Sequence, residues 1–218
     1  MGDSQGVSRL LVVMRHSVRL DADPDATWGD RETRPYDSPI VDSELPGAAA
    51  ARLEALGLTA IASSPFRRCL ETAGVVARAL GIGAVHVHFG LGELMHQVRA
   101  CARGFERVEE LEELVPLSDA DADAALGAGV ALASRVSGDV EWREGVDAGQ
   151  ARFLAALRGL AADHARLLVV THGDLLAAAA ADFLGPDAVV YDVRECGTLT
   201  IDVGGSPALR GSDRVLML

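Results

Sequence analysis

Short apolar runs alternate along the chain with Ala-rich and mixed segments that start near Pro and stop near Gly. Each short run is bounded by structure-breaking residues, which is typical of a buried strand. The Ala-rich segment between Pro46 and Gly57 has Pro where helices start and Gly where they end. The predicted strands are 10–14, 60–63, 84–89, 167–170 and 198–203, and the predicted helices are 46–57, 65–80, 150–164 and 174–184.

The order of these elements, in which strands and helices alternate, is typical of a parallel sheet with helical connections. We therefore predict an α/β fold, a three-layer sandwich with a mostly parallel central sheet and helices on both faces. The length of 218 residues and the hydrophobic fraction of 49% suffice for one domain over residues 1–218 but not for two. Residues 214–218 are a candidate for one more short strand.

Two segments depart from this alternation. The polar stretch after the first strand carries Pro24, Pro35 and Pro39, which predicts a long loop. Residues 94–147 contain an acidic run, an Asp-Ala repeat at 119–124 and small residues around 127–133 that resemble helix material. We interpret 94–147 as an insertion that forms a mostly helical lid.

Charge and composition limit the classes of partner. The formal net charge of −12 disfavours nucleic acid or an anionic membrane surface, so an anionic substrate needs a local basic pocket. All 20 basic residues are arginine, so only the position of an arginine carries information. No apolar run approaches the roughly 18 residues of a membrane span, and the polar start lacks a signal peptide's apolar region. We expect a soluble, cytoplasmic protein.

The three cysteines, Cys69, Cys101 and Cys196, are odd in number and lack metal-ligand spacing, so we expect reduced thiols rather than disulfides or a zinc site.

Chemically active side chains follow four of the predicted strands. They are Arg15-His16, the segment 63–68 with its arginines, Glu93 and Thr171-His172. Ligand sites in open parallel sheets form beyond the carboxyl ends of the strands, so these residues are predicted to converge. Arginine forks match phosphate oxygens, and a neutral imidazole can attack phosphorus. The pattern therefore favours an anion site over a zinc site.

The same segments resemble the ordered motifs of the histidine phosphatase superfamily, which includes the phosphoglycerate-mutase-like enzymes. The matching stretches are "RH" after the first strand, "SSPFRRCLETA" at 63–73, "LGE" at 91–93 and "VVTHGD" at 169–174. The resemblance implies His16 as the nucleophile, Glu93 as the proton donor, and Arg15, Arg68 and His172 as catalytic phosphate ligands. The family's spacing from the serine selects Arg68 over Arg67, which we expect to be exposed to solvent.

"RHSVRLD" also resembles the branch with suppressor-of-T-cell-receptor-signalling and ecdysteroid-phosphate phosphatases, in which an arginine follows the histidine by three positions. That arginine is Arg19, and the resemblance implies a second anion clamp on the substrate. Two departures from the family's pattern concern substrate geometry. Ser17 replaces the usual glycine, and "DSPIVDSELPG" is a stretched form of the family's Pro-Leu-Thr/Ser-x-x-Gly segment.

The leading hypothesis is a metal-independent phosphomonoesterase that works through a phosphohistidine on His16, without a cofactor. The substrate is a phosphorylated small molecule or a phosphoprotein, and a homodimer is left open. One alternative is a mutase, although "LGELMHQ" lacks the mutases' longer signature and only Arg99, Arg103 and Arg107 are near enough to hold a second phosphate. Another alternative is a non-catalytic phosphate-binding scaffold.

Further candidates have structural explanations that are at least as good. Trp28, Arg34 and Tyr36 either line a substrate pocket or pack the first loop onto the body. A metal site at His86, His88 and His96 is disfavoured, because alternating histidines suit a half-exposed strand. Thr198 is either a hydrogen-bonding residue near the site or an ordinary strand residue.

Overall fold

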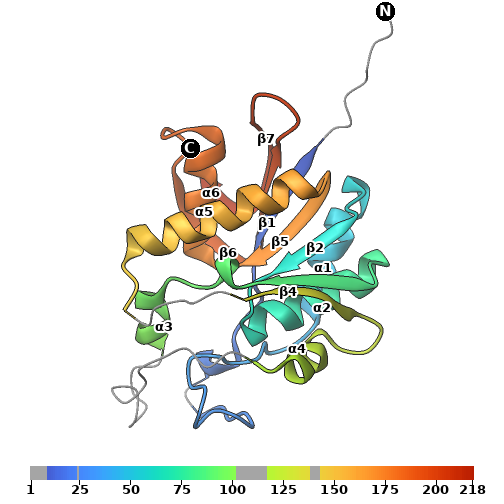
Figure 1. Cartoon of the computed structure of the whole chain (residues 1–218), viewed down its shortest axis with the longest axis vertical. Helices are drawn as coiled ribbons and strands as arrows, with labels where there is room; N and C mark the ends of the chain where they lie inside the picture. The colour runs from blue at the N-terminus through green and yellow to red at the C-terminus, as the bar shows by residue number, and fades with distance from the viewer. Residues whose placement is uncertain (1–8, 24, 102–116, 138–142) are drawn as a thin grey trace, which may run out of the picture.

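A seven-stranded sheet with the order β4-β3-β2-β5-β1-β6-β7 forms the centre of the computed structural model, which describes residues 9–23, 25–101, 117–137 and 143–218. The first five strands of this order run parallel, and β6 and β7 join antiparallel at the other edge (Figure 1). The strands are β1 Leu10–Arg15, β2 Ala60–Ser63, β3 Ala84–His88, β4 Ala131–Val136, β5 Arg166–Thr171, β6 Val190–Asp202 and β7 Ala208–Met217.

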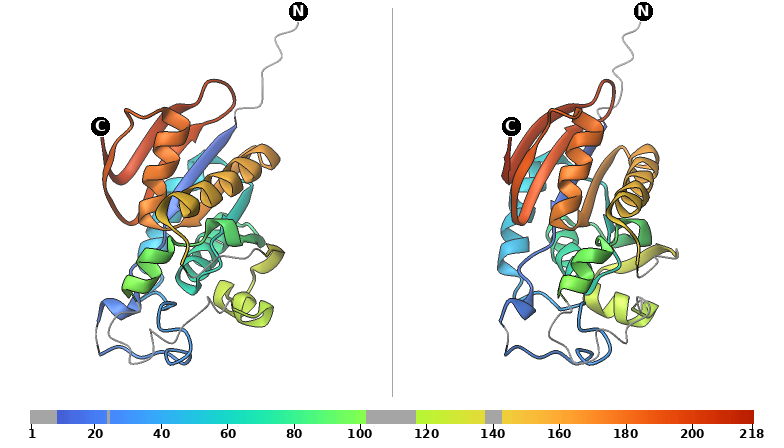
Figure 2. Two further views of the ribbon diagram at one scale, coloured as in Figure 1. Left: turned by 60° about the vertical axis from the view of Figure 1, so that its left-hand side comes forward. Right: turned by 90° about the vertical axis from the view of Figure 1, so that its left-hand side faces the viewer.

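Helices cover both faces of the sheet, which confirms the predicted three-layer α/β fold. The right-hand view of Figure 2 shows α5 on one side of the sheet and α1 on the other. The helices are α1 Glu44–Leu53, α2 Arg67–Leu80, α3 Met95–Cys101, α4 Asp119–Leu126, α5 Val146–Asp163 and α6 Gly173–Leu184, with short 3₁₀ turns at Leu20–Ala22, Glu54–Leu56 and Phe89–Leu91. None of these helices is both long enough and apolar enough to cross a membrane.

Strand β1 shows how the sequence builds two cores. Leu10, Val12 and Met14 point into the core under α1, α2 and α4, whereas Leu11 and Val13 point into the core under α5 and α6. Side chains of a strand alternate between its faces, so a strand buried on both faces must be continuously apolar. This is why the opening run contains no polar residue until Arg15.

The carboxyl ends of β1 and β5 lie side by side. The two strands pair in register from Leu10 opposite Arg166 to Arg15 opposite Thr171. The first long loop and α3 lie beyond this end of the sheet, at the bottom of Figure 1. The residues that follow β1 and β5 are therefore neighbours.

The described part of the insertion corrects one prediction. Residues 127–133 were expected to be helical, but Gly127 and Gly129 have positive φ and Ala131 begins β4. Strand β4 pairs parallel with β3 and extends the sheet by one edge strand. The acidic run at 109–113, Arg103 and Arg107 lie outside the described residues, so the lid itself remains a prediction.

The carboxyl-terminal strands are longer than predicted. Strand β6 begins at Val190 rather than at 198, and β7 spans Ala208–Met217 rather than 214–218. The first half of β6 and the whole of β7 carry exposed positions because this part of the sheet is open to solvent, so neither reads as a continuous apolar run.

The close packing of α2 on α4 provides a stability test. A Cβ on Gly74 would lie 2.0 Å from the carbonyl oxygen of Leu126, which is backbone and cannot rotate away. We expect Gly74→Ala to lower the free energy of unfolding by about 1–3 kcal/mol, as overpacking does. Gly159 on α5 has no atom within 4 Å of the same position, so Gly159→Ala should raise the free energy of unfolding by about 0.5–1 kcal/mol. Urea titration of both variants measures this difference, and equal effects would contradict the packing.

Candidate active site

Two histidines meet where β1 and β5 end. His16 follows Arg15 directly, and its backbone N–H donates to the carbonyl of Thr171 at 2.9 Å. His172 follows Thr171 and precedes the first residue of α6. The ring centroids of the two histidines are 5.3 Å apart. The parallel pairing of two strands thus places two imidazoles, 156 positions apart in sequence, in one site.

His16 has the tautomer that a nucleophile needs. Its side chain is 3% exposed, and Nδ1 lies 2.7 Å from the carbonyl oxygen of Ser17. A carbonyl oxygen only accepts, so Nδ1 carries the proton and the lone pair is on Nε2. Burial, and then the positive charges of Arg68 and His172, hold the pKa of His16 well below its usual value. The imidazole is therefore neutral at neutral pH.

Arg68 is a buried cation beside these rings. Arg68 lies in the first turn of α2 and is fully buried. Its Nη1 donates to the carbonyl oxygen of Tyr36 at 3.1 Å. Its Nη2 lies 3.7 Å from Glu93 and its Nη1 lies 3.8 Å from Asp37, both too long for hydrogen bonds. Its Nε has no hydrogen-bond partner among the described residues. A buried guanidinium with an unused donor is suited to an anion.

Glu93 and His172 form a buried pair. Oε2 of Glu93 lies 3.0 Å from Nδ1 of His172, and the hydroxyl of Ser64 lies 2.9 Å from Nε2 of His172. Burial alone would raise the pKa of Glu93, but His172 and Arg68 outweigh it and lower the pKa to about 2. Burial also lowers the pKa of His172, against the opposing effect of Glu93. Glu93 is therefore an ionised carboxylate in the unliganded site.

A cavity of about 320 Å³ opens beside His16 and Glu93. Arg15 and Arg19 line it too, and each is already paired with a carboxylate. Arg15 lies 3.1 Å from Glu195, and Arg19 donates to both oxygens of Asp21, through Nε at 2.8 Å. A phosphate entering the cavity would compete with these carboxylates for the two guanidinium groups.

The structure thus brings together Arg15, His16, Arg68, Glu93 and His172, with Arg19 at the same cavity. Their catalytic roles remain predictions. Sequence reasoning missed Ser64 and Asp37, which lie in the quoted stretches "SSPFRRCLETA" and "DSPIVDSELPG", and Glu195, which no motif signals. Glu195 reaches Arg15 from an irregular part of β6, where Cys196 has a φ of 54° and the pairing with β7 shifts.

The expectation for Arg67 is wrong. Its side chain is only 21% exposed, and its guanidinium lies 2.8 Å from Asp30 of the first loop. Its backbone N–H also donates to Asp37 at 2.7 Å. The loop lies over the start of α2, so the surface that a free helix would expose is covered.

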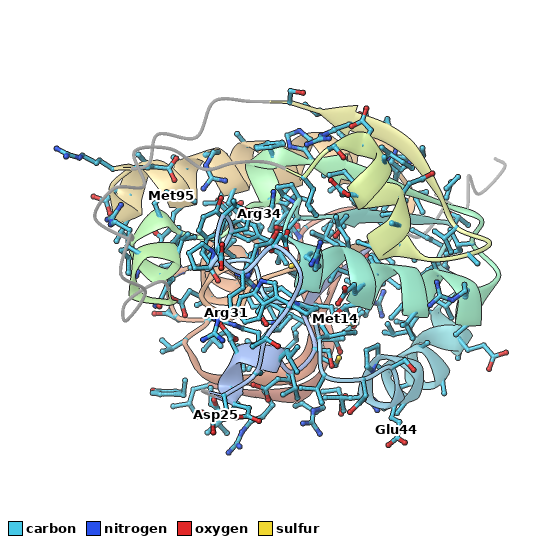
Figure 3. All side chains as sticks on the ribbon, turned by 90° about the horizontal axis from the view of Figure 1, so that it is seen from below. Met14, Asp25, Arg31, Arg34, Glu44 and Met95 are labelled. Carbon is cyan, nitrogen blue, oxygen red and sulfur yellow. The ribbon has the colours of Figure 1, made fainter. Side chains whose placement is uncertain are left out.

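The first loop is attached to the body through its own side chains. Tyr36 is buried against Phe66, with ring centroids 6.2 Å apart, and Arg34 pairs with Asp37. Figure 3, seen from the end of the sheet where β1 finishes, shows the loop with Arg31 and Arg34 crossing this end of the molecule. Trp28 packs with Arg31, whose guanidinium lies 5.3 Å from the ring centroid. In this structure the three loop candidates pack the loop and do not line the cavity beside His16.

Of the three metal candidates, His86 and His88 have local partners, whereas Nδ1 of His96 is buried and has no hydrogen-bond partner among the described residues. His86 bonds Ser134 of β4 at 2.8 Å, and His88 accepts from the backbone N–H of Gly90 at 2.9 Å. Within the described ranges, no group of three or more His, Cys, Asp or Glu side chains is arranged to hold a metal ion. Thr198 lies opposite Met14 in the antiparallel ladder and is buried as a strand residue.

Paired histidines, a buried arginine and a carboxylate at the carboxyl edge of this sheet define an α/β protein with a histidine-phosphatase fold. The chain belongs to the histidine phosphatase superfamily (branch 1), whose family model matches residues 46–201. The matched residues include Arg68, Glu93 and His172, whereas Arg15, His16 and Arg19 precede them. A search of curated proteins finds no significant match.

Solved structures share the fold at low identity. A mycobacterial glucosyl-3-phosphoglycerate phosphatase in complex with VO3 is 19% identical with a TM-score of 0.56, over 94% of this chain and 98% of that one. A phosphoglycerate mutase from Bacillus anthracis is 17% identical with a TM-score of 0.57, over 95% and 94%. A phosphoserine phosphatase variant from Entamoeba histolytica, in complex with phosphoserine, is 16% identical with a TM-score of 0.51, over 93% and 95%. The fold therefore serves both phosphatases and a mutase.

Proposed function

We propose that the chain is a metal-independent phosphomonoesterase that acts through a phosphohistidine on His16. Its substrate is a phosphorylated small molecule or a phosphoprotein. The observation that supports this most is the tautomer of His16, whose Nδ1–H is fixed by the carbonyl of Ser17 while the ring lines the cavity. A scaffold that only holds phosphate needs no neutral imidazole with a free lone pair.

The reaction has two steps. In the first, Nε2 of His16 attacks phosphorus, the N–P bond forms as the bond to the ester oxygen breaks, and Glu93 protonates the departing oxygen. Arg68, Arg15 and Arg19 stabilise charge on the equatorial oxygens. In the second, water attacks phosphorus, Glu93 takes its proton, and the N–P bond breaks to release phosphate and neutral His16.

The low pKa of Glu93 means that it must gain a proton before it can act as the acid. Glu93 is ionised in the free protein, with a pKa of about 2, and the substrate is one source of that proton. Phosphate monoesters have a second pKa of about 6, so their monoanion carries one proton into the site. The negative charge of the bound phosphate also offsets Arg68 and His172, which raises the pKa of Glu93 towards protonation.

The role of Glu93 is testable through the leaving group. Phenyl phosphate and p-nitrophenyl phosphate have nearly the same shape, but p-nitrophenolate departs without needing a proton. We expect Glu93→Gln to lower kcat/KM, which reports the leaving-group step alone, by on the order of a hundredfold to a thousandfold for phenyl phosphate and by less than about tenfold for p-nitrophenyl phosphate. Steady-state assays of both substrates measure this, and equal losses would remove Glu93 from the role of acid.

Arg19 is expected to matter less than the core arginine. Asp21 binds one edge of its guanidinium, formed by Nε and Nη2, so a phosphate must compete with this carboxylate for that edge. We expect Arg19→Ala to lower kcat/KM by about tenfold, mostly through KM. A loss that equals or exceeds that of Arg68→Ala in parallel assays would show that the loop clamp is central.

The mutase alternative shares the first step and differs in what attacks the phosphohistidine. Incubation with 3-phosphoglycerate and catalytic 2,3-bisphosphoglycerate, with 2-phosphoglycerate and free phosphate both assayed, separates the two. We expect phosphate release from aryl phosphates, insensitive to EDTA and inhibited by vanadate, and no appreciable isomer interconversion. Interconversion faster than phosphate release would favour the mutase, and no turnover of any ester would favour the scaffold.

A further inference from the structure

The turn that carries Glu93 is bonded to one arginine of a distant helix. Arg152 of α5 donates through Nη1 to the carbonyl oxygens of Phe89, Gly90 and Gly92, at 3.2, 2.9 and 3.3 Å. Its Nη2 donates to the carbonyl oxygen of Glu93 itself, at 3.3 Å. One guanidinium therefore satisfies four of the five consecutive carbonyls of the turn.

The fifth carbonyl of this turn is bonded by the strand that leads to the site. The hydroxyl of Thr171, next to His172, donates to the carbonyl oxygen of Leu91 at 2.8 Å. The main chain from Phe89 to Glu93 is thus attached to α5 on one side and to the end of β5 on the other. Its position relative to His172 is set by these bonds.

Arg152 is itself fixed in orientation. One edge of its guanidinium, formed by Nε and Nη2, faces Glu144. Each of these two nitrogens donates to a carboxylate oxygen at 2.9 Å. The Arg152 and Glu144 side chains are only 16% and 10% exposed, so solvent screens this bidentate pair weakly. The turn also touches α5 directly, since a Cβ on Gly90 would lie 2.5 Å from Cβ of Ala156.

Arg152 does not line the cavity beside His16, and it contacts the backbone of Glu93 rather than its carboxyl group. Its effect on the reaction must therefore pass through the position of Glu93. The Glu93 carboxylate lies within 3.7 Å of Arg68 and 3.0 Å of His172, so a small displacement of its main chain changes both distances. A displacement of about 1 Å in a catalytic group can cost on the order of a hundredfold in rate.

We propose that Arg152, oriented by Glu144, is the positioning residue that holds Glu93 in place for proton transfer to the leaving group. This inference rests on the proposed function, in which Glu93 is the acid. Phosphate binding and attack by His16 do not involve Arg152. Loss of Arg152 consequently lowers kcat/KM for poor leaving groups and leaves kcat/KM for good leaving groups and the affinity for phosphate nearly unchanged.

The test compares leaving groups in Arg152→Met, Arg152→Lys and Glu144→Gln. For Arg152→Met we expect kcat/KM for phenyl phosphate to fall by roughly tenfold to a hundredfold, while kcat/KM for p-nitrophenyl phosphate stays within about threefold. Arg152→Lys keeps one donor group and should recover part of the loss. Glu144→Gln keeps the guanidinium but weakens its orientation, so the loss for phenyl phosphate should again exceed that for p-nitrophenyl phosphate, to a smaller degree. This variant also keeps the test open if Arg152→Met fails to fold.

Arg158 supplies the matched control. It lies on the same helix and pairs with Asp182 of α6, away from the turn, so Arg158→Met should leave both substrates unchanged. Losses of equal size on both substrates, or no loss on either, would overturn the role of Arg152. Failure of the wild-type protein to hydrolyse either ester would instead contradict the proposed function, and a Glu93→Gln variant without selectivity would contradict the acid.

Discussion

His16→Ala is expected to lower kcat/KM for aryl phosphates by on the order of a thousandfold or more, because the nucleophile defines the reaction path. No neighbour is placed to substitute. Both nitrogens of His172 already face partners, Nδ1 towards Glu93 and Nε2 towards Ser64. Water could attack phosphorus directly in the variant, but it is a weaker nucleophile than the unprotonated Nε2 of His16, whose tautomer the carbonyl of Ser17 fixes.

A matched control separates loss of the nucleophile from loss of a histidine. His86 lies on β3, bonds Ser134 and does not line the cavity, so His86→Ala should keep kcat/KM within about threefold. Both variants should show the same thermal unfolding within a few degrees. A folded His16→Ala protein with near-normal turnover would remove His16 from the mechanism.

The second large effect is expected at Arg68. Arg68→Gln should lower kcat/KM by about a hundredfold to a thousandfold, because a buried guanidinium with an unused Nε donor stabilises charge that develops on phosphate. Its loss also removes the guanidinium that lies 3.7 Å from the carboxylate of Glu93. The pKa of Glu93 should then rise, so the pH profile should change together with the rate.

Arg67→Ala is the matched control for Arg68. It removes an adjacent arginine whose guanidinium pairs with Asp30 and does not line the cavity. We therefore expect kcat/KM to fall by less than about fivefold. Vanadate affinity reports the anion site directly and should weaken in Arg68→Gln alone. If Arg67→Ala were the more damaging change, the assignment of the phosphate ligand in this helix would be wrong.

Much of this arrangement could be predicted from the sequence. The parallel strands of the core could be predicted because β1, β2 and β5 are buried on both faces and appear in the sequence as continuous apolar runs. Their carboxyl ends carry Arg15, His16 and His172, so placing the strands also placed these site residues. The convergence of Arg68 with them follows from helix α2 starting just after β2.

Features on the open edges could not be predicted in the same way. Strands β4 and β7 form the two edges of the sheet, and their exposed positions, like those in the first half of β6, hide the apolar pattern. Glu195 depends on an irregularity of β6, and Arg152 depends on how α5 crosses the turn before Glu93. These contacts arise from tertiary packing, which local propensity does not encode.

The most direct test of the account is to identify the phosphorylated residue. The protein is mixed with a labelled aryl phosphate, quenched in alkali within milliseconds, digested, and mapped by mass spectrometry under basic conditions. We predict one phosphoryl group on the peptide that contains His16, stable in base, lost in acid and absent from His16→Ala. A label on another residue, a label that survives acid, or turnover with no labelled peptide would contradict the phosphohistidine mechanism.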